Sequence, residues 1–131
     1  MSRQPLRLGK EFENKVAFSL GVVASGRFLH TAGITARDRN GDVVGVGDMK
    51  AQVAQCFANL GDVLAAAGAG FGDVVKYTIY TTDIDLFDRS TREIRFPYFV
   101  DRPASTLIQV SRLIDPRMLV EIEAVVCLGQ E

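Results

Sequence analysis

The sequence predicts an α+β domain of two layers, in which one mixed β-sheet carries two helices on one face. Three observations lead to this fold class. Short β-branched segments lie before, between and after two helical segments, so the order is neither strictly alternating nor divided into two blocks. One helical segment has a clear apolar face. The last strand alternates between an apolar face and a mixed face, which is typical of a sheet covered on one side.

The composition predicts a single domain over residues 1–131. With 47% hydrophobic and 24% charged side chains, the chain can form a core and is not a disordered polypeptide. It has no apolar run long enough to span a membrane and no leader-like apolar segment at its start. The net charge of −1 argues against a nucleic-acid-binding protein, and the two distant cysteines predict unbridged thiols. We therefore expect a cytoplasmic protein without membrane or nucleic-acid partners.

The first third of the chain predicts strands and turns. Residues 16–23 and 27–34 are apolar and flank the turn signal Ser25-Gly26, so we expect them to pair as a hairpin. Asn40-Gly41 is a tight-turn dipeptide, and residues 43–44 are expected to add a short strand after it.

The principal helix is expected to begin after Asp48, whose side chain suits an N-cap. Apolar residues then recur at steps of three and four, and Gly68 suits the end of this helix. Residues 73–82 are rich in β-branched and aromatic side chains and predict a strand. Residues 83–100 predict a second helix, which Pro97 is expected to end or kink near residue 95 because proline removes a helical hydrogen bond.

The last two strands carry the candidate chemistry. Residues 105–111 alternate as a strand, and residues 119–128 form the final one. In the final strand one face is formed by Val120, Ile122, Ala124 and Val126, and the other by Leu119, Glu121, Glu123, Val125 and Cys127. Two carboxylates among apolar groups indicate an interface or a site. From spacing alone, Glu121 and Glu123 are either water-holding carboxylates with a raised pKa or solvated, salt-bridged residues.

Other motifs leave alternatives open. His30 has no catalytic motif beside it, and a lone histidine of this kind is usually a packed or surface residue. The chain has neither a Gly-x-Ser-x-Gly motif nor a phosphate-binding loop. Arg102, Arg112 and Arg117 flank the last two strands, and each is either a clamp for a carboxylate or a surface arginine.

Four stretches together resemble the Rid family, also called the YjgF or liver perchloric-acid-soluble protein family. They are residues 26–33, 51–60, 67–76 and 120–124, and the Thr81-Thr82-Asp83 step matches as well. The resemblance implies a chorismate-mutase-like fold and a homotrimer whose sheets form a central barrel with the helices outside. It also implies clefts between subunits, in which reactive enamines and imines are hydrolysed to a keto acid and ammonia without a metal or an organic cofactor.

The resemblance implies that Glu121 is the catalytic residue that holds the attacking water. It also reveals a departure, because the family pattern Pro-Ala-Arg-Ser reads Pro103-Ala104-Ser105-Thr106 here. Ser105 therefore stands where the family has the arginine that pairs with a substrate carboxylate, a pair worth roughly 2 to 5 kcal/mol when desolvated. The expected substrate-binding residues are Ser105, Thr106, Ala32, Gly33, Phe18, Thr91 and Arg102.

Two functions from different classes stay open at this point. The first is a hydrolase or deaminase that acts on a small imine, enamine or related metabolite, with altered substrate specificity because of Ser105. The second is a homotrimer that binds a small metabolite without turnover. Ribonuclease activity, a name that some family members carry, is a third possibility, and the near-neutral charge gives it no support.

Overall fold

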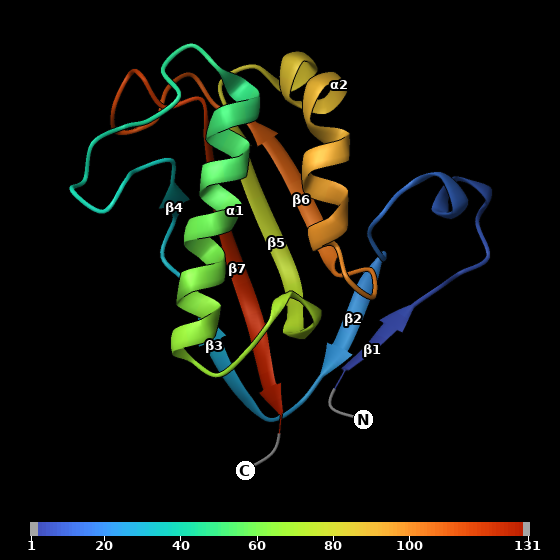
Figure 1. The fold of residues 1–131 in the computed structure, drawn as a ribbon. Coiled ribbons are helices and arrows are strands. Elements are labelled where there is room, and N and C mark those ends of the chain that lie inside the picture. Colours follow the sequence, from blue (N-terminus) through green and yellow to red (C-terminus); the bar gives the residue numbers. More distant parts are fainter. Residues whose placement is uncertain (1–2, 130–131) are drawn as a thin grey trace.

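A computed structural model describes residues 3–129 and confirms the α+β fold class (Figure 1). The strands are β1 (Arg3–Leu6), β2 (Gly21–Ala24), β3 (Arg27–His30), β4 (Ile34–Thr35), β5 (Val74–Thr81), β6 (Ala104–Gln109) and β7 (Val120–Gly129). The main sheet has the order β3-β7-β5-β6, and β4 also pairs with β7. Because β5 and β6 run parallel while the pairs with β7 are antiparallel, the sheet is mixed, as expected.

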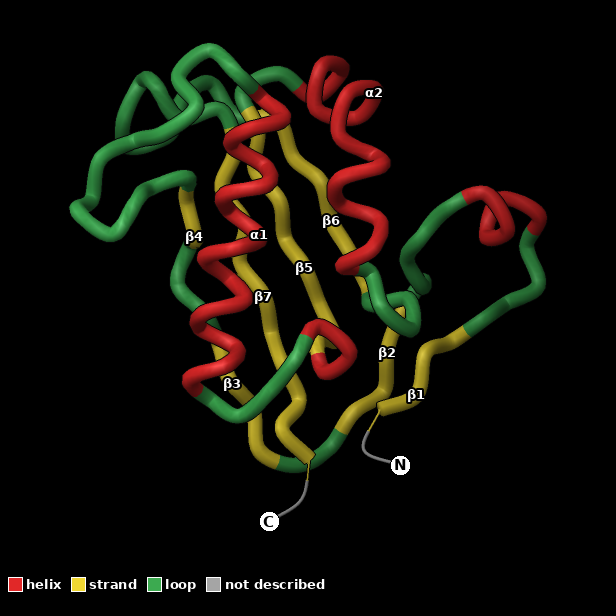
Figure 2. The backbone as a smooth tube through the Cα atoms, in the orientation of Figure 1, coloured by secondary structure: helices red, strands yellow, loops and turns green. Residues whose placement is uncertain are grey.

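Two helices, α1 (Met49–Ala66) and α2 (Ile84–Arg95), lie side by side over one face of this sheet (Figures 1 and 2). The Asp48 side chain caps α1 by accepting a hydrogen bond from the Ala51 N–H at 3.0 Å. The α-helical part of the second helical segment ends at Arg95, because Pro97 lies in the short 3₁₀ turn that follows, η3 (Phe96–Tyr98). Within residues 3–129, neither helix is both long and apolar enough to cross a membrane.

The core lies between the two helices and the sheet. The alternation of β7 is confirmed from Val120 to Val126, since Val120, Ile122, Ala124 and Val126 are all buried beneath the helices. Cys127 departs from it, because it is buried as well. Aromatic rings pack together in the part of the core next to η3. Phe57 of α1 stacks on Tyr98 with ring centroids 4.4 Å apart and contacts Tyr77 edge-on. The Tyr77 hydroxyl donates to the Tyr98 carbonyl at 2.8 Å, so this buried phenol is satisfied.

The opposite face of the sheet is not covered by any described part of the chain. Its residues are His30, Lys76, Thr78, Tyr80, Thr106, Ile108, Glu121, Glu123 and Val125. They are polar and apolar in mixture and half-buried to exposed, as the alternation of the last strand predicts. We refer to this surface below as the open face.

The predicted hairpin between residues 16–23 and 27–34 is wrong. β2 pairs with β1 instead, and β3 pairs with β7, so that Arg27 lies opposite Gly129. The reason lies at Gly26, whose positive φ of 124° turns the chain from one sheet into the other. A turn signal identifies the change of direction but not the partner strand. The expected strand at residues 43–44 is reduced to a single bridge between Arg37 and Val43, across the predicted Asn40-Gly41 turn.

Candidate active site

The Glu121 carboxylate is the most chemically distinctive group on the open face. It is half-buried, and no residue between 3 and 129 donates a hydrogen bond to it. Burial raises the pKa of Glu121, and the nearby Glu123 charge raises it further. A carboxylate with a raised pKa and open lone pairs is suited to take a proton from water and return it.

Gly33 lies directly against this carboxylate. It belongs to the link between β3 and β4, and the pairing of Thr35 with Glu121 brings this link beside β7. A Cβ atom at Gly33 would overlap Glu121 Oε2 and lie 2.7 Å from its Cδ. The glycine is therefore required for space, because any side chain would displace the carboxylate from its position.

Hydrogen bonds from Thr31 hold the corner that contains Ala32 and Gly33. The Thr31 hydroxyl accepts from the Ala124 N–H at 3.0 Å and donates to the Ala32 carbonyl at 2.7 Å. Its own N–H donates to the Ala124 carbonyl at 3.0 Å. Ala32 and Gly33 are exposed, so the structure brings a fixed, accessible backbone corner together with the Glu121 carboxylate.

The second glutamate of the pair has a different environment. Glu123 accepts a hydrogen bond from the Tyr80 hydroxyl at 2.5 Å, and this bond is the main reason that the pKa of Tyr80 is raised. Two carboxylates on the same face of one strand are thereby distinguished: Glu123 is engaged by a phenol, whereas Glu121 remains open.

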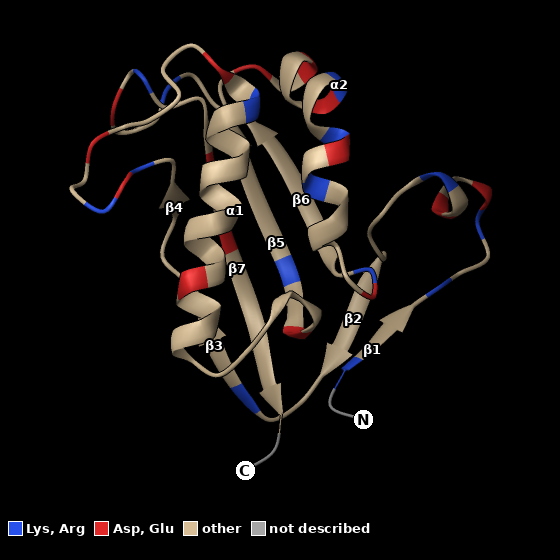
Figure 3. Cartoon of the chain, viewed as in Figure 1, with Lys and Arg blue, Asp and Glu red and all other residues tan. Residues whose placement is uncertain are grey.

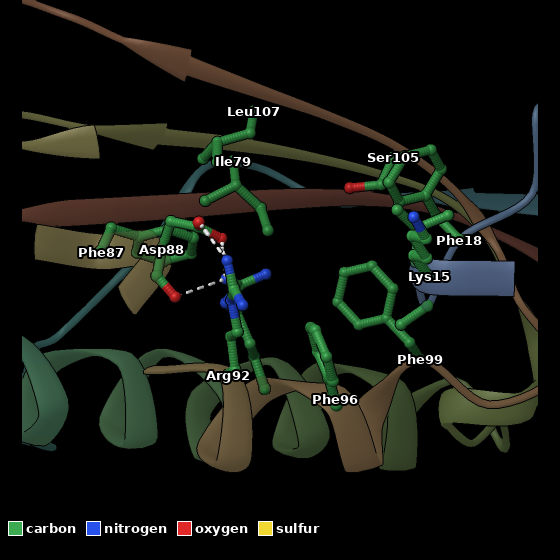
Figure 4. A pocket seen from close by; sticks show the side chains of 13 residues that line it. Lys15, Phe18, Ile79, Phe87, Asp88, Arg92, Phe96, Phe99, Ser105 and Leu107 are labelled. Atoms are coloured by element: carbon green, nitrogen blue, oxygen red, sulfur yellow. Dashed lines mark hydrogen bonds and ion pairs between the residues drawn. The ribbon is translucent and has the colours of Figure 1, made fainter. Parts of the chain in front are cut away.

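A cavity of about 310 Å³ lies on the other side of the sheet, between α2, β6 and the segment before β2. Phe18 and Ser105 line it, as does Arg95, and Figure 4 places Ser105 and Phe18 at one end and Asp88 and Arg92 at the other. The remaining wall is largely aromatic and aliphatic, formed by Ile79, Phe87, Phe96, Phe99 and Leu107 among others. We call this space the α2 cavity.

Apart from Lys15, the charged residues that line the α2 cavity come from α2, which carries bands of both signs in Figure 3. Asp88 pairs with Arg92 at 2.6 Å and with Arg95 at 2.8 Å. The hydrogen bond from Arg92 is the largest cause that lowers the pKa of Asp88, so this carboxylate is ionised. Burial lowers the pKa of Arg95, and the pair with Asp88 opposes that shift.

The other expected substrate-binding residues line neither the Gly33–Glu121 contact nor the α2 cavity. Thr91 is fully buried, donates to the Phe87 carbonyl at 2.6 Å and accepts from Arg95 Nε at 3.0 Å. Thr106 lies on the open face, where it contacts Lys76 Nζ at 2.6 Å. Arg102 donates to the Glu13 carbonyl at 2.9 Å and lines a separate cavity with Arg3 and Arg7.

The expected set is therefore divided between two places in the chain. Glu121, Ala32 and Gly33 are together on one side, and Phe18 and Ser105 are together in the α2 cavity. Sequence reasoning missed Asp88, Arg92 and Arg95. Their spacing of four and three residues, which puts them on one helical face, was the available signal.

Comparison with known proteins identifies the relatives of this chain. The sequence profile described as Endoribonuclease L-PSP matches residues 9–128. A RutC family protein of Pyrococcus horikoshii is 38% identical over 107 residues, which is 79% of this chain and 82% of that protein. A RutC family protein of Synechocystis is 37% identical over 111 residues, covering 82% and 83%.

Solved structures agree with these sequence matches. A Rid family protein of Yersinia pestis, described as of unknown function, superposes with a TM-score of 0.86 at 36% identity, over 98% of this chain and 100% of that one. The YjgF gene product of E. coli superposes with a TM-score of 0.68 at 26% identity, over 95% and 93%.

Proposed function

Because the chain belongs to the Endoribonuclease L-PSP family, with Rid and YjgF proteins among its structural relatives, we propose that it is a hydrolase for small imines or enamines. The reaction takes place in a cleft between subunits of a homotrimer and yields a carbonyl compound and ammonia. The observation that carries this proposal is the unengaged Glu121 carboxylate held against the Gly33 backbone.

Glu121 would act as base and then as acid in this reaction. As the water oxygen attacks the imine carbon, the carboxylate takes one proton from the water, and the electron pair of the C=N bond moves to nitrogen. Glu121 returns this proton to the nitrogen, which gives a neutral carbinolamine. Glu121 then takes the proton of the carbinolamine hydroxyl and passes it to the nitrogen, so that the C=O bond forms as the C–N bond breaks and ammonia leaves. A raised pKa suits both steps, because it brings the proton affinity of the carboxylate nearer to that of the reacting groups.

The division of the site within one protomer supports a trimer. Glu121 and Gly33 lie on one side of the sheet and Ser105 lines the α2 cavity on the other, so a second copy is needed to bring both groups to one ligand. The open face, which includes the exposed Ile108, also lacks a covering layer among the described residues. In the proposed trimer the open faces of three copies meet as a barrel.

Sedimentation equilibrium tests the assembly directly. We expect a mass near three times the 14.3 kDa of one chain, independent of concentration in the micromolar range. A monomer at these concentrations would contradict both the trimer and the shared cleft.

Ammonia release from 2-iminopropanoate, generated in the assay from an amino acid, tests the reaction. We expect the wild-type protein to release ammonia faster than a protein-free control. Ser105→Arg restores the arginine of the family pattern, and we expect it to raise kcat/KM for this carboxylate substrate by about tenfold or more, since it adds a charge-assisted pair. Absence of activity in both proteins would contradict the proposal.

The alternative is a trimer that binds a small metabolite without turnover. Ser105 favours it, because the serine removes the charge on which the family reaction relies. Activity in Ser105→Arg alone would support this alternative for the natural protein, and Glu121→Ala would then weaken binding without changing any rate.

A further inference from the structure

The side chains that line the α2 cavity carry more positive than negative charge. Lys15, Arg92 and Arg95 line it together with a single carboxylate, Asp88, so the described wall has a formal surplus of two positive charges. The remaining lining is aromatic or aliphatic, apart from the Ser105 hydroxyl and backbone atoms. Lys15 and Arg92 are exposed, whereas Arg95 is buried, and a buried cation attracts an anion more strongly than a solvated one because little water screens its charge.

Of these cations, Arg95 is the one whose guanidinium is held by both ring contacts and hydrogen bonds. Its side chain is only 9% exposed, and its guanidinium lies over the Phe87 ring at 4.7 Å and the Phe96 ring at 5.1 Å. Nε donates to Thr91 Oγ1 at 3.0 Å, and Nη2 donates to the Asp88 side chain at 2.8 Å and to the Asp88 carbonyl at 3.1 Å.

One terminal nitrogen of this guanidinium is left over. No residue in 3–129 accepts a hydrogen bond from Arg95 Nη1, although Arg95 lines the cavity. Rings, Thr91 and Asp88 fix the guanidinium in place, so a ligand that binds it does not have to order a flexible side chain.

Asp88 joins the second arginine to the first. Its Oδ2 accepts from Arg92 Nη2 at 2.6 Å while its Oδ1 accepts from Arg95. A single carboxylate cannot neutralise two guanidinium groups. It holds them close together on one helical face and leaves donors of both for another anion.

We propose that Arg95 and Arg92 form the carboxylate-binding subsite of this protein and take the place of the charge that Ser105 lacks. The ligand class is a small monocarboxylate with an apolar or aromatic side chain, since the carboxylate meets the arginines and the rest meets Phe18, Phe96 and Phe99. The cavity volume of about 310 Å³ is at the lower end for small-molecule sites and suits a ligand of this size. The assignment rests on the proposed function in that it identifies the substrate class of the same cleft.

Titration calorimetry with phenylpyruvate tests the subsite on the full chain. Phenylacetone, which has the same ring and ketone but no carboxylate, is the matched neutral ligand. We expect phenylpyruvate to bind more tightly than phenylacetone to the wild-type protein. Arg92→Gln and Arg95→Gln should each weaken phenylpyruvate binding by about 10- to 100-fold, the usual effect of losing a charge-assisted hydrogen bond, and leave phenylacetone binding unchanged.

Two further variants separate recognition from general effects. Arg89→Gln removes the same charge from an exposed position of α2 outside the cavity, and we expect wild-type binding of phenylpyruvate. Thr91→Val keeps every arginine but removes the acceptor of Arg95 Nε, so it should weaken binding less than Arg95→Gln. Because Arg95 is buried, its variants are compared only after thermal unfolding shows that they are folded. If the Arg95 variants do not fold, Arg92→Gln tests the subsite alone, because Arg92 is exposed.

The outcomes distinguish this inference from the proposed function. Equal affinity of the two ligands for the wild type, or unchanged phenylpyruvate binding in folded Arg92→Gln and Arg95→Gln, would overturn the subsite. Loss of binding in these variants without any ammonia release by the wild type would uphold the subsite and reject the hydrolase. Turnover of an uncharged imine, without binding of phenylpyruvate through its carboxylate, would uphold the hydrolase and reject the subsite.

Discussion

Glu121→Gln is expected to reduce kcat/KM for imine hydrolysis by about 10²- to 10⁴-fold, the usual contribution of a general acid–base group. The amide keeps the shape of the side chain but cannot take a proton from water. Glu123→Gln is the matched control, because it makes the same change on the same face of β7 at a carboxylate already engaged by Tyr80. We expect a much smaller loss there, measured by the same ammonia assay.

The pH dependence of Glu121 gives this prediction a second readout. The pKa of Glu121 is raised above 4.5 in the folded protein, so the hydrolysis rate should fall as the pH decreases through that raised value. For stability the sign is opposite. The folded state binds this proton more tightly than the unfolded state, so the contribution of Glu121 to stability is present at low pH and is lost as the pH rises through the folded pKa.

Glu121→Gln should therefore unfold at the same temperature as the wild type at neutral pH, or at a higher one. Differential scanning calorimetry beside the activity assay separates the two roles. A lower Tm together with the lost activity would indicate that Glu121 supports the fold, and it would argue against its role in the reaction.

Gly33→Ala is expected to reduce hydrolysis by about 10²-fold while the protein stays folded. The added methyl group would overlap Glu121 Oε2, and the long glutamate side chain can give way only by moving its carboxylate. A displacement of a reacting group by about 1 Å is enough for a loss of this size. Because Gly33 is exposed and its φ is not positive, the fold itself should tolerate alanine.

Gly70→Ala is the matched control for this variant. A Cβ atom at Gly70 would meet no atom within 4 Å, and its φ of −138° suits any residue. We expect wild-type kcat/KM from Gly70→Ala and an unchanged Tm from both variants. Full activity of Gly33→Ala would show that the position of the Glu121 carboxylate does not matter for the reaction.

The elements that carry strong local signals were predictable from the sequence. α1 has a capping Asp48, a regular apolar face and Gly68 at its end, and the structure reproduces all three. The alternation of β7 correctly predicted one buried face and one open face. β1 was missed because Arg3–Leu6 has no β-branched residue, and its place depends on tertiary hydrogen bonds such as that from Arg3 Nη1 to the Asp101 carbonyl at 2.8 Å.

The site was predictable only where it depends on a strand. Placing Glu121 on the mixed face required only the period of two, whereas its role came from the family resemblance. The Asp88, Arg92 and Arg95 cluster was not predicted, because a charged helical face in a sequence usually indicates a solvated surface. Only the folded structure shows that this face lines a cavity. The contact between Gly33 and Glu121 joins residues 88 positions apart, and local patterns carry no information about such distances.

The position of β7 also has a consequence for how the protein is made. β7 pairs with β3, β4 and β5, and only β5 and β6 of the main sheet pair without it (Figure 1). Ribosomes synthesise a chain from its N-terminus, so β7 is produced after every other described strand. Until it emerges, the helices have no complete sheet on which to fold, and their apolar faces stay accessible to chaperones and to other nascent chains. The buried face of β7 thus makes the emergence of this strand from the ribosome, rather than any local helix, the event that commits this domain to its fold.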